Sequence, residues 1–128
     1  MSRRSNGAET LLAVTAFLEV GAGVALLVVP APVLELIVGS GESHTGAAMG
    51  RLAGAAILSL GAACWWARGD SGSHAARGLV GGLLTYNAAV VALVLWGSLG
   101  APNPILWAAV VVHGVMALWC VRFLWIGR

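Results

Sequence analysis

Residues 78–99 read GLVGGLLTYNAAVVALVLWGSL, a run of 22 residues without a charged side chain. A helix needs about 20 mostly apolar residues to cross the hydrocarbon core of a bilayer, because each residue advances the helix by about 1.5 Å. Three more stretches reach this length with one charged side chain each, and they are residues 11–29, 47–67 and 104–126. The sequence therefore predicts four transmembrane helices.

The composition of the whole chain also indicates an integral membrane protein. Of its 128 residues, 59% are hydrophobic and 9% are charged, and the mean hydropathy is +0.91. A soluble domain has about a quarter of its residues charged, so this chain could not cover its surface with polar groups in water. These values exclude an ordinary soluble enzyme, a nucleic-acid-binding protein and a disordered chain. The length predicts a single domain, residues 1–128.

Proline, glycine and short polar residues mark the ends of the predicted helices. Pro30 and Pro32 end the first helix, because proline lacks an N–H group and its ring clashes with the preceding turn. Residues 69–73 form a turn before the third helix, and residues 100–104 separate the third from the fourth. Residues 33–38 are too short to span a membrane, so we expect a brief segment at the interface. The prediction is an all-α, four-helix up-down bundle with antiparallel neighbours.

The arginines predict the orientation of the chain in the membrane. All seven basic residues are arginines, and six of them flank the predicted helices on one side: Arg3, Arg4, Arg68, Arg77, Arg122 and Arg128. Cytoplasmic loops are enriched in Lys and Arg, so we predict a bacterial inner-membrane protein with both termini in the cytoplasm. Glu19 within the first apolar run, and the lack of a soluble domain after it, argue against a cleaved signal peptide.

Two residue types report on the environment and packing of the helices. Tryptophan near a helix end is typical of an anchor at the membrane interface, and five residues fit this pattern: Trp65, Trp66, Trp96, Trp107 and Trp125. Glycines spaced by four residues let helix backbones approach closely in a membrane. The pattern occurs at Gly46, Gly50 and Gly54, with Gly61 two turns further along the same face, and again at Gly78 and Gly82. The spacing leaves open whether the packing partner lies within the chain or in a second copy. We therefore expect a homo-oligomer or a subunit of a membrane complex.

Each predicted helix carries one strongly polar side chain inside the membrane. Counted from the outer face, Glu19 is 10 residues before Val29 and so about 15 Å deep, while Asn87 and His113 are about 14 Å deep. Arg51 lies closer to that face, and its long side chain can extend toward the same level. Because such groups are costly in hydrocarbon, we predict a shared interior layer in which Glu19 pairs with Arg51.

Three functions are compatible with this polar layer. In the first, it forms a pocket for a small lipophilic ligand such as a quinone, whose carbonyl oxygens would be bound by Tyr86, Asn87 and His113. In the second, the chain is a proton-coupled transporter in which Glu19 binds a proton or a cationic substrate. In the third, the polar groups only set the register of the helices in a structural subunit.

Other chemistry finds less support in the residues. Haem at His113 would need a second strong ligand, such as the same residue of another copy. Cys64 and Cys120 fall toward the reducing, cytoplasmic side, so we predict free thiols. No Ser-His-acid, Cys-His or zinc-binding spacing occurs, which argues against an enzyme and a metal site. The sequence identifies no cofactor.

The chain resembles two families of small membrane proteins. Residues 16–20, Ala-Phe-Leu-Glu-Val, resemble the first helix of small multidrug resistance transporters, and over these five residues the likeness implies that Glu19 exchanges protons with cationic drugs. A broader likeness rests on Val-Val-Pro at 28–30, Leu-Ile-Val-Gly at 36–39, the glycine-rich second span and the two spans after it. These features resemble DoxX-like bacterial membrane proteins. That resemblance implies a four-span fold and specifies no activity.

Overall fold

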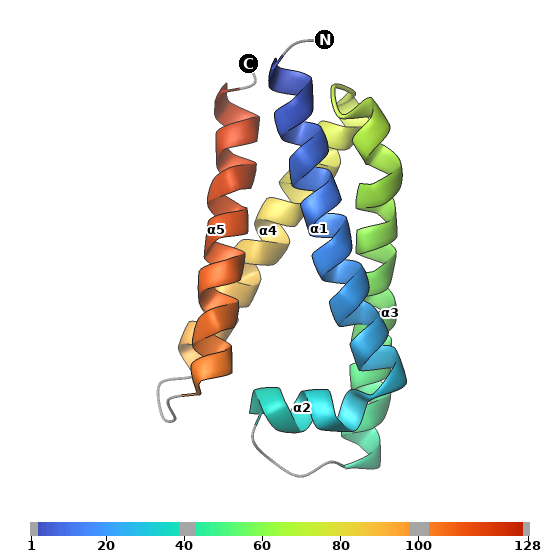
Figure 1. The fold of residues 1–128 in the computed structure, drawn as a ribbon. Helices are drawn as coiled ribbons and strands as arrows, with labels where there is room; N and C mark the ends of the chain where they lie inside the picture. Colours follow the sequence, from blue (N-terminus) through green and yellow to red (C-terminus); the bar gives the residue numbers. More distant parts are fainter. Residues whose placement is uncertain (1–2, 39–42, 98–102, 127–128) are drawn as a thin grey trace. The chain divides into compact units, whose positions relative to one another are not determined.

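The regular secondary structure is entirely helical in residues 3–38, 43–97 and 103–126, the ranges that a computed structural model describes (Figure 1). The elements are α1 (Arg3–Val28), α2 (Pro30–Val38), α3 (His44–Ala67), the 3₁₀ turn η1 (Arg68–Asp70), α4 (His74–Gly97) and α5 (Pro104–Ile126). No strand occurs in these ranges, which confirms the all-α prediction.

Four of these helices, α1, α3, α4 and α5, are long and apolar enough to cross a membrane. They coincide with the four predicted stretches and follow the same order. Helix α1 begins at Arg3, eight residues before the predicted residue 11, because its polar first turns continue the helix beyond the apolar run. Residues 98–99 of the third predicted stretch and linker residues 100–102 lie outside the described residues.

The chain divides into two compact units. One unit comprises residues 1–12 and 67–128, and it contains the hairpin formed by α4 and α5. The other comprises residues 13–66, and it contains most of α1 together with α2 and most of α3.

Glycines bring α1 and α3 into backbone contact within the unit of residues 13–66. A Cβ placed on Gly23 would lie 2.7 Å from the backbone nitrogen of Leu58, and one on Gly54 would lie 2.8 Å from the carbonyl oxygen of Gly23. At Gly61 the added atom would lie 2.9 Å from the backbone nitrogen of Val20. No larger residue fits at these three positions unless the helices separate. Gly54 and Gly61, which belong to the predicted glycine pattern, therefore find their packing partner within the chain.

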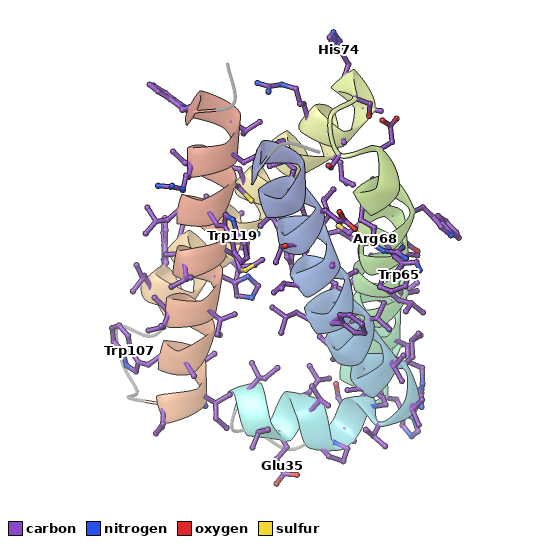
Figure 2. The ribbon with its side chains drawn as sticks, turned by 45° about the horizontal axis from the view of Figure 1, so that its top comes forward. Glu35, Trp65, Arg68, His74, Trp107 and Trp119 are labelled. Atoms are coloured by element: carbon purple, nitrogen blue, oxygen red, sulfur yellow. The ribbon has the colours of Figure 1, made fainter. Side chains whose placement is uncertain are left out.

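Pro30 and Pro32 separate α1 from α2. Neither residue has an N–H group, so the carbonyls one turn earlier lose their donors and α1 ends just before them. Helix α2 turns away and lies across the ends of α1 and α3 (Figure 1), where Leu34 and Pro30 lie 3.2 Å and 3.3 Å from the Cβ position of Gly50. Glu35 is exposed and points away from the other helices of this unit (Figure 2). The short segment predicted after the first span is a helix of nine residues.

Helices α4 and α5 pack side by side as an antiparallel hairpin (Figure 1). Helix α4 buries a stripe of residues at helical spacing, namely Ala76, Val80, Leu83 and Asn87, and α5 buries Met116 and Cys120. At one end of the hairpin, Arg77 donates from Nη2 to the carbonyl oxygen of Leu124 at 3.3 Å, and its guanidinium lies 5.9 Å from the ring centre of Phe123. The last carbonyls of a helix lack intrahelical donors, so Arg77 of α4 caps the C-terminal end of α5.

Polar side chains cap the first turns of three helices. The capping bonds run from Gly46 N to Ser43 Oγ (3.0 Å), from Ala76 N to Ser73 Oγ (3.1 Å) and from Ile105 N to Asn103 Oδ1 (2.9 Å). Each bond satisfies an N–H group that an α-helix leaves unpaired at its start. Pro104 occupies the first position of α5, which suits a residue without an N–H group.

The cap of α4 leads to a measurable expectation. Ser73→Ala should lower the free energy of unfolding by about 1 kcal/mol, because the Ala76 N–H loses its acceptor. Ser59→Ala is the matched control, since the Ser59 hydroxyl donates to the Ala55 carbonyl inside α3 at 2.8 Å and its removal leaves no backbone donor unpaired. The measurement is reversible unfolding in detergent micelles, followed by tryptophan fluorescence. Equal values for the two variants would contradict the capping role.

The tryptophans that the sequence predicts as interface anchors are exposed on the helices. These residues are Trp65, Trp66, Trp96, Trp107 and Trp125. Figure 2 shows Trp107 projecting outward from α5. An indole ring has an apolar body and one polar N–H group, so exposed rings near the ends of apolar helices favour a position at the membrane interface.

Candidate functional site

A pair of polar side chains joins α4 to α5 partway along the hairpin. His113 Nδ1 lies 2.8 Å from Asn87 Oδ1, within hydrogen-bonding distance. Asn87 is buried and His113 is half-buried. His113 is nine residues from Pro104 at the start of α5, about 14 Å along the axis. The sequence predicts Asn87 and His113 at the same depth, and a direct hydrogen bond between their helices is consistent with that prediction.

A main-chain carbonyl determines the direction of this hydrogen bond. Asn87 Nδ2 donates to the carbonyl oxygen of Leu83 at 2.7 Å, and a carbonyl oxygen can only accept. The amide group is therefore oriented with its NH₂ toward Leu83 and its oxygen toward His113. Because that oxygen is also only an acceptor, His113 Nδ1 must carry the hydrogen and donate it.

Tyr86 restricts the imidazole from another side. The ring centres of Tyr86 and His113 are 5.6 Å apart and the two planes meet at 83°, an edge-to-face arrangement. This geometry is favourable between aromatic rings, because the positive edge of one ring meets the negative face of the other. Together, Asn87 and Tyr86 hold the imidazole of His113 in one orientation.

The second nitrogen of His113, Nε2, lies on an accessible side of the ring. His113 makes no hydrogen bond other than the one to Asn87 in the described part of the chain. In the same residues, every buried side-chain nitrogen or oxygen has a hydrogen-bond partner. Nε2 has no such partner, so it is not fully buried. The site therefore presents a fixed imidazole with one nitrogen available to another molecule.

Glu19 lies on α1 in the unit of residues 13–66, where only 6% of its surface is exposed. Thr15, one helical turn earlier, is also buried. Thr15 and Glu19 thus share a buried face of α1. Glu19 belongs to a different unit from Asn87 and His113, so the four-residue layer stays a prediction.

Arg51 does not lie beside Glu19, and the predicted ion pair between them is wrong. Arg51 is exposed on α3. The contacts of Gly61 with Ala16 and Val20 place Glu19 at the level of about residue 60 of α3. Arg51 is nine residues from that level, which is about 14 Å along the helix axis. The glycine contacts between α1 and α3 fix the register that separates the two charges.

Two features of the hairpin are not predicted from the sequence. The first is the hydrogen bond from Asn87 to the Leu83 carbonyl. The sequence does carry a signal for it, because an asparagine side chain within a helix can reach the backbone carbonyl four residues earlier. The second is Arg77, whose position in the sequence indicates only the orientation of the chain, and which caps α5 in the structure. No local pattern signals this role, because Arg77 and Leu124 are 47 residues apart.

Comparison with known protein families, with characterised proteins and with solved structures gives no match. Within the described residues, no three His, Cys, Asp or Glu side chains cluster as ligands for a metal ion. Cys64 and Cys120 are both buried. The geometry around His113 is therefore the basis for proposing a function.

Proposed function

We propose that this chain is a small multi-pass membrane protein whose α4–α5 hairpin binds a small lipophilic, quinone-like molecule at His113. Four helices long enough and apolar enough to cross a membrane support the location. The observation that carries the binding site is the Asn87–His113 pair, which holds an imidazole with an accessible nitrogen partway along two apolar helices. A polar side chain inside a membrane span is costly, and an open hydrogen-bonding atom on it favours a ligand.

The surroundings of His113 fit an aromatic ligand with a few polar atoms. Tyr86 contributes an aromatic ring beside the imidazole. Met116, one turn further along α5, and Leu83, one turn before Asn87 on α4, are buried apolar residues. Small-molecule sites combine an apolar lining with a small number of placed polar groups, and a benzoquinone ring is flat and apolar with polar atoms only at its edge.

We further propose an up-down bundle of the four helices in a bacterial inner membrane, with both termini in the cytoplasm. The six arginines on one side of the predicted spans and the exposed tryptophans support this arrangement. The resemblance to DoxX-like proteins supports the same four-span architecture. A homo-oligomer or a membrane complex is favoured by Gly78 and Gly82 of α4, where an added Cβ would meet nothing within 4 Å.

The binding site is tested with purified protein in nanodiscs. We expect lipophilic molecules to be extractable from the protein, and a short-chain benzoquinone or its hydroquinone to quench tryptophan fluorescence saturably. His113→Leu should raise the Kd at least about tenfold, because a hydrogen bond to the ligand is worth about 1.4 kcal/mol. Gly114→Ala is the matched control, since the added Cβ meets no atom within 4 Å and the Kd should stay within about twofold. An absorbance spectrum of the same sample reveals any haem.

The outcomes of this experiment separate the pocket from a purely structural role. Saturable binding that His113→Leu weakens and Gly114→Ala preserves supports the proposal. If no small molecule is extracted and neither quinone nor hydroquinone binds, the proposal is wrong and the polar pair serves helix packing alone. A haem absorbance band that His113→Leu removes would also contradict it, because haem would then be the ligand.

A second candidate function is proton-coupled transport, and the burial of Glu19 favours it. A buried carboxyl group on an apolar helix is a site that can take up and release a proton. Glu19→Gln keeps the size of the side chain and removes its charge. In proteoliposomes this variant should lose any proton-driven uptake of a lipophilic cation if the chain is a transporter. If His113 forms a binding pocket alone, Glu19→Gln leaves the Kd for the hydroquinone unchanged.

A further inference from the structure

We infer that His113 accepts the hydrogen bond from its ligand, so the site selects molecules that carry an O–H group over those that offer only carbonyl oxygens. This inference rests on the proposed binding function and names the class of ligand. It departs from the expectation drawn from the sequence, in which the polar residues bind the carbonyl oxygens of a quinone. A hydroquinone or another lipophilic phenol fits the site better than the corresponding quinone.

The direction follows from a chain of three groups that starts at the backbone. The Leu83 carbonyl can only accept, so the Asn87 amide donates to it and turns its own oxygen toward His113. That oxygen accepts from Nδ1 at 2.8 Å. A neutral imidazole carries one hydrogen, and here Nδ1 holds it. Nε2 is therefore left with a lone pair and no hydrogen.

The surrounding helices favour this neutral form of the ring. A second proton would place a positive charge within an apolar helix, which is costly in a membrane. Helices α4 and α5 contain no aspartate or glutamate that could pair with such a charge. Their arginines, Arg77 and Arg122, are positively charged and would repel it. Neutral His113 can accept a hydrogen bond at Nε2 but cannot donate one there.

The accessible position of Nε2 makes this lone pair relevant to a ligand. In the described residues, every buried side-chain nitrogen has a hydrogen-bond partner. Nε2 has none, so it is not buried. Tyr86 limits rotation of the ring. An incoming hydroxyl group meets a fixed acceptor. An incoming carbonyl oxygen meets a second acceptor, and neither group is satisfied away from water. A site built to bond a hydroxyl group rejects an analogue that lacks it.

The test uses two probes that cannot interconvert, a para-alkylphenol and its methyl ether, with the full-length protein in nanodiscs. The phenol should bind at least about tenfold more tightly than the ether. In Asn87→Ala the ring is free to move its hydrogen to Nε2, so this preference should fall to about twofold or less. Gly114→Ala should keep the tenfold preference. Histidine labelled with ¹⁵N gives a second readout on the wild-type protein, which should show hydrogen on Nδ1 and none on Nε2 of His113.

The outcomes of the phenol and ether titration and of the ¹⁵N measurement separate the inference from the proposed function. A tenfold preference for the phenol, together with hydrogen on Nδ1, supports the inference. Equal affinity for phenol and ether, or hydrogen on Nε2, overturns the inference while saturable binding of both probes preserves the proposed function. If neither probe binds, the inference fails, and the proposed function fails with it only if neither quinone nor hydroquinone binds either. The ¹⁵N signals of His113 are identified by their loss in His113→Leu.

Discussion

Gly23→Ala is expected to lower the free energy of unfolding by about 2 kcal/mol or more, whereas Gly21→Ala, two residues away on α1, should leave it unchanged or slightly raised. The added Cβ at Gly23 would lie 2.7 Å from the backbone nitrogen of Leu58 and 2.8 Å from the carbonyl oxygen of Gly54. Backbone atoms cannot move aside as a flexible side chain can. The helices α1 and α3 must therefore separate along the whole contact, and every close contact between them weakens.

Gly21 provides a sharp control for this prediction. A Cβ at Gly21 meets nothing within 4 Å, and alanine favours a helix over glycine by up to about 1 kcal/mol. Both variants are compared with wild type by titrating sodium dodecyl sulfate into mixed micelles and following tryptophan fluorescence. If Gly23→Ala and Gly21→Ala unfold at the same detergent fraction, the backbone contact between α1 and α3 is refuted.

The second large effect is expected at the polar pair of the hairpin. Asn87→Ala should lower the free energy of unfolding by about 2 kcal/mol, because it leaves the Nδ1–H group of His113 without an acceptor. His113→Ala should cost a similar amount. In the double variant the loss should be smaller than the sum of the two, by about 1 kcal/mol, the size of a hydrogen bond between membrane helices.

Thr85→Val is the matched control for the polar pair. Thr85 is exposed on α4, and its hydroxyl donates only to the Gly81 carbonyl inside its own helix, at 3.1 Å. Its removal should change the free energy of unfolding by no more than about 0.5 kcal/mol. The four proteins of the cycle are measured by the same detergent titration. Strict additivity of Asn87→Ala and His113→Ala would show that the hydrogen bond contributes nothing to stability.

The sequence predicts the helices well because their signals are local. An uncharged run such as residues 78–99 is long enough to span a bilayer whatever it packs against. Pro30 and Pro32 break a helix because they lack N–H groups, and this does not depend on any partner. Ser43, Ser73 and Asn103 cap helices through bonds to residues two or three positions away. These features need no knowledge of the tertiary structure.

The candidate site is predicted only in part, because it depends on distances between helices. Counting residues from helix ends indicates that Asn87 and His113 share a depth, and the hydrogen bond between them agrees. The same counting misplaces Arg51, because it starts from the expected helix ends, whereas the glycine contacts between α1 and α3 set a register that leaves Arg51 about 14 Å from the level of Glu19. The direction of the hydrogen bond depends on the amide orientation at Asn87, which the Leu83 carbonyl determines. The sequence gives the identity of these side chains but not their orientation.

The four long apolar helices and the proline break after the first can be read from neighbouring residues alone, since hydrophobic length, missing N–H groups and capping residues act over a few positions. Which glycines meet a partner helix depends instead on how the folded helices pack. Gly23, Gly54 and Gly61 do so, while an added Cβ at Gly78 or Gly82 would meet nothing. Gly54 and Gly82 each follow another glycine by four residues, yet Gly54 meets a partner helix and Gly82 does not, because contact between helices depends on the rotation and register of each pair. Those two quantities arise from the fit of whole surfaces and are not contained in any one stretch of residues.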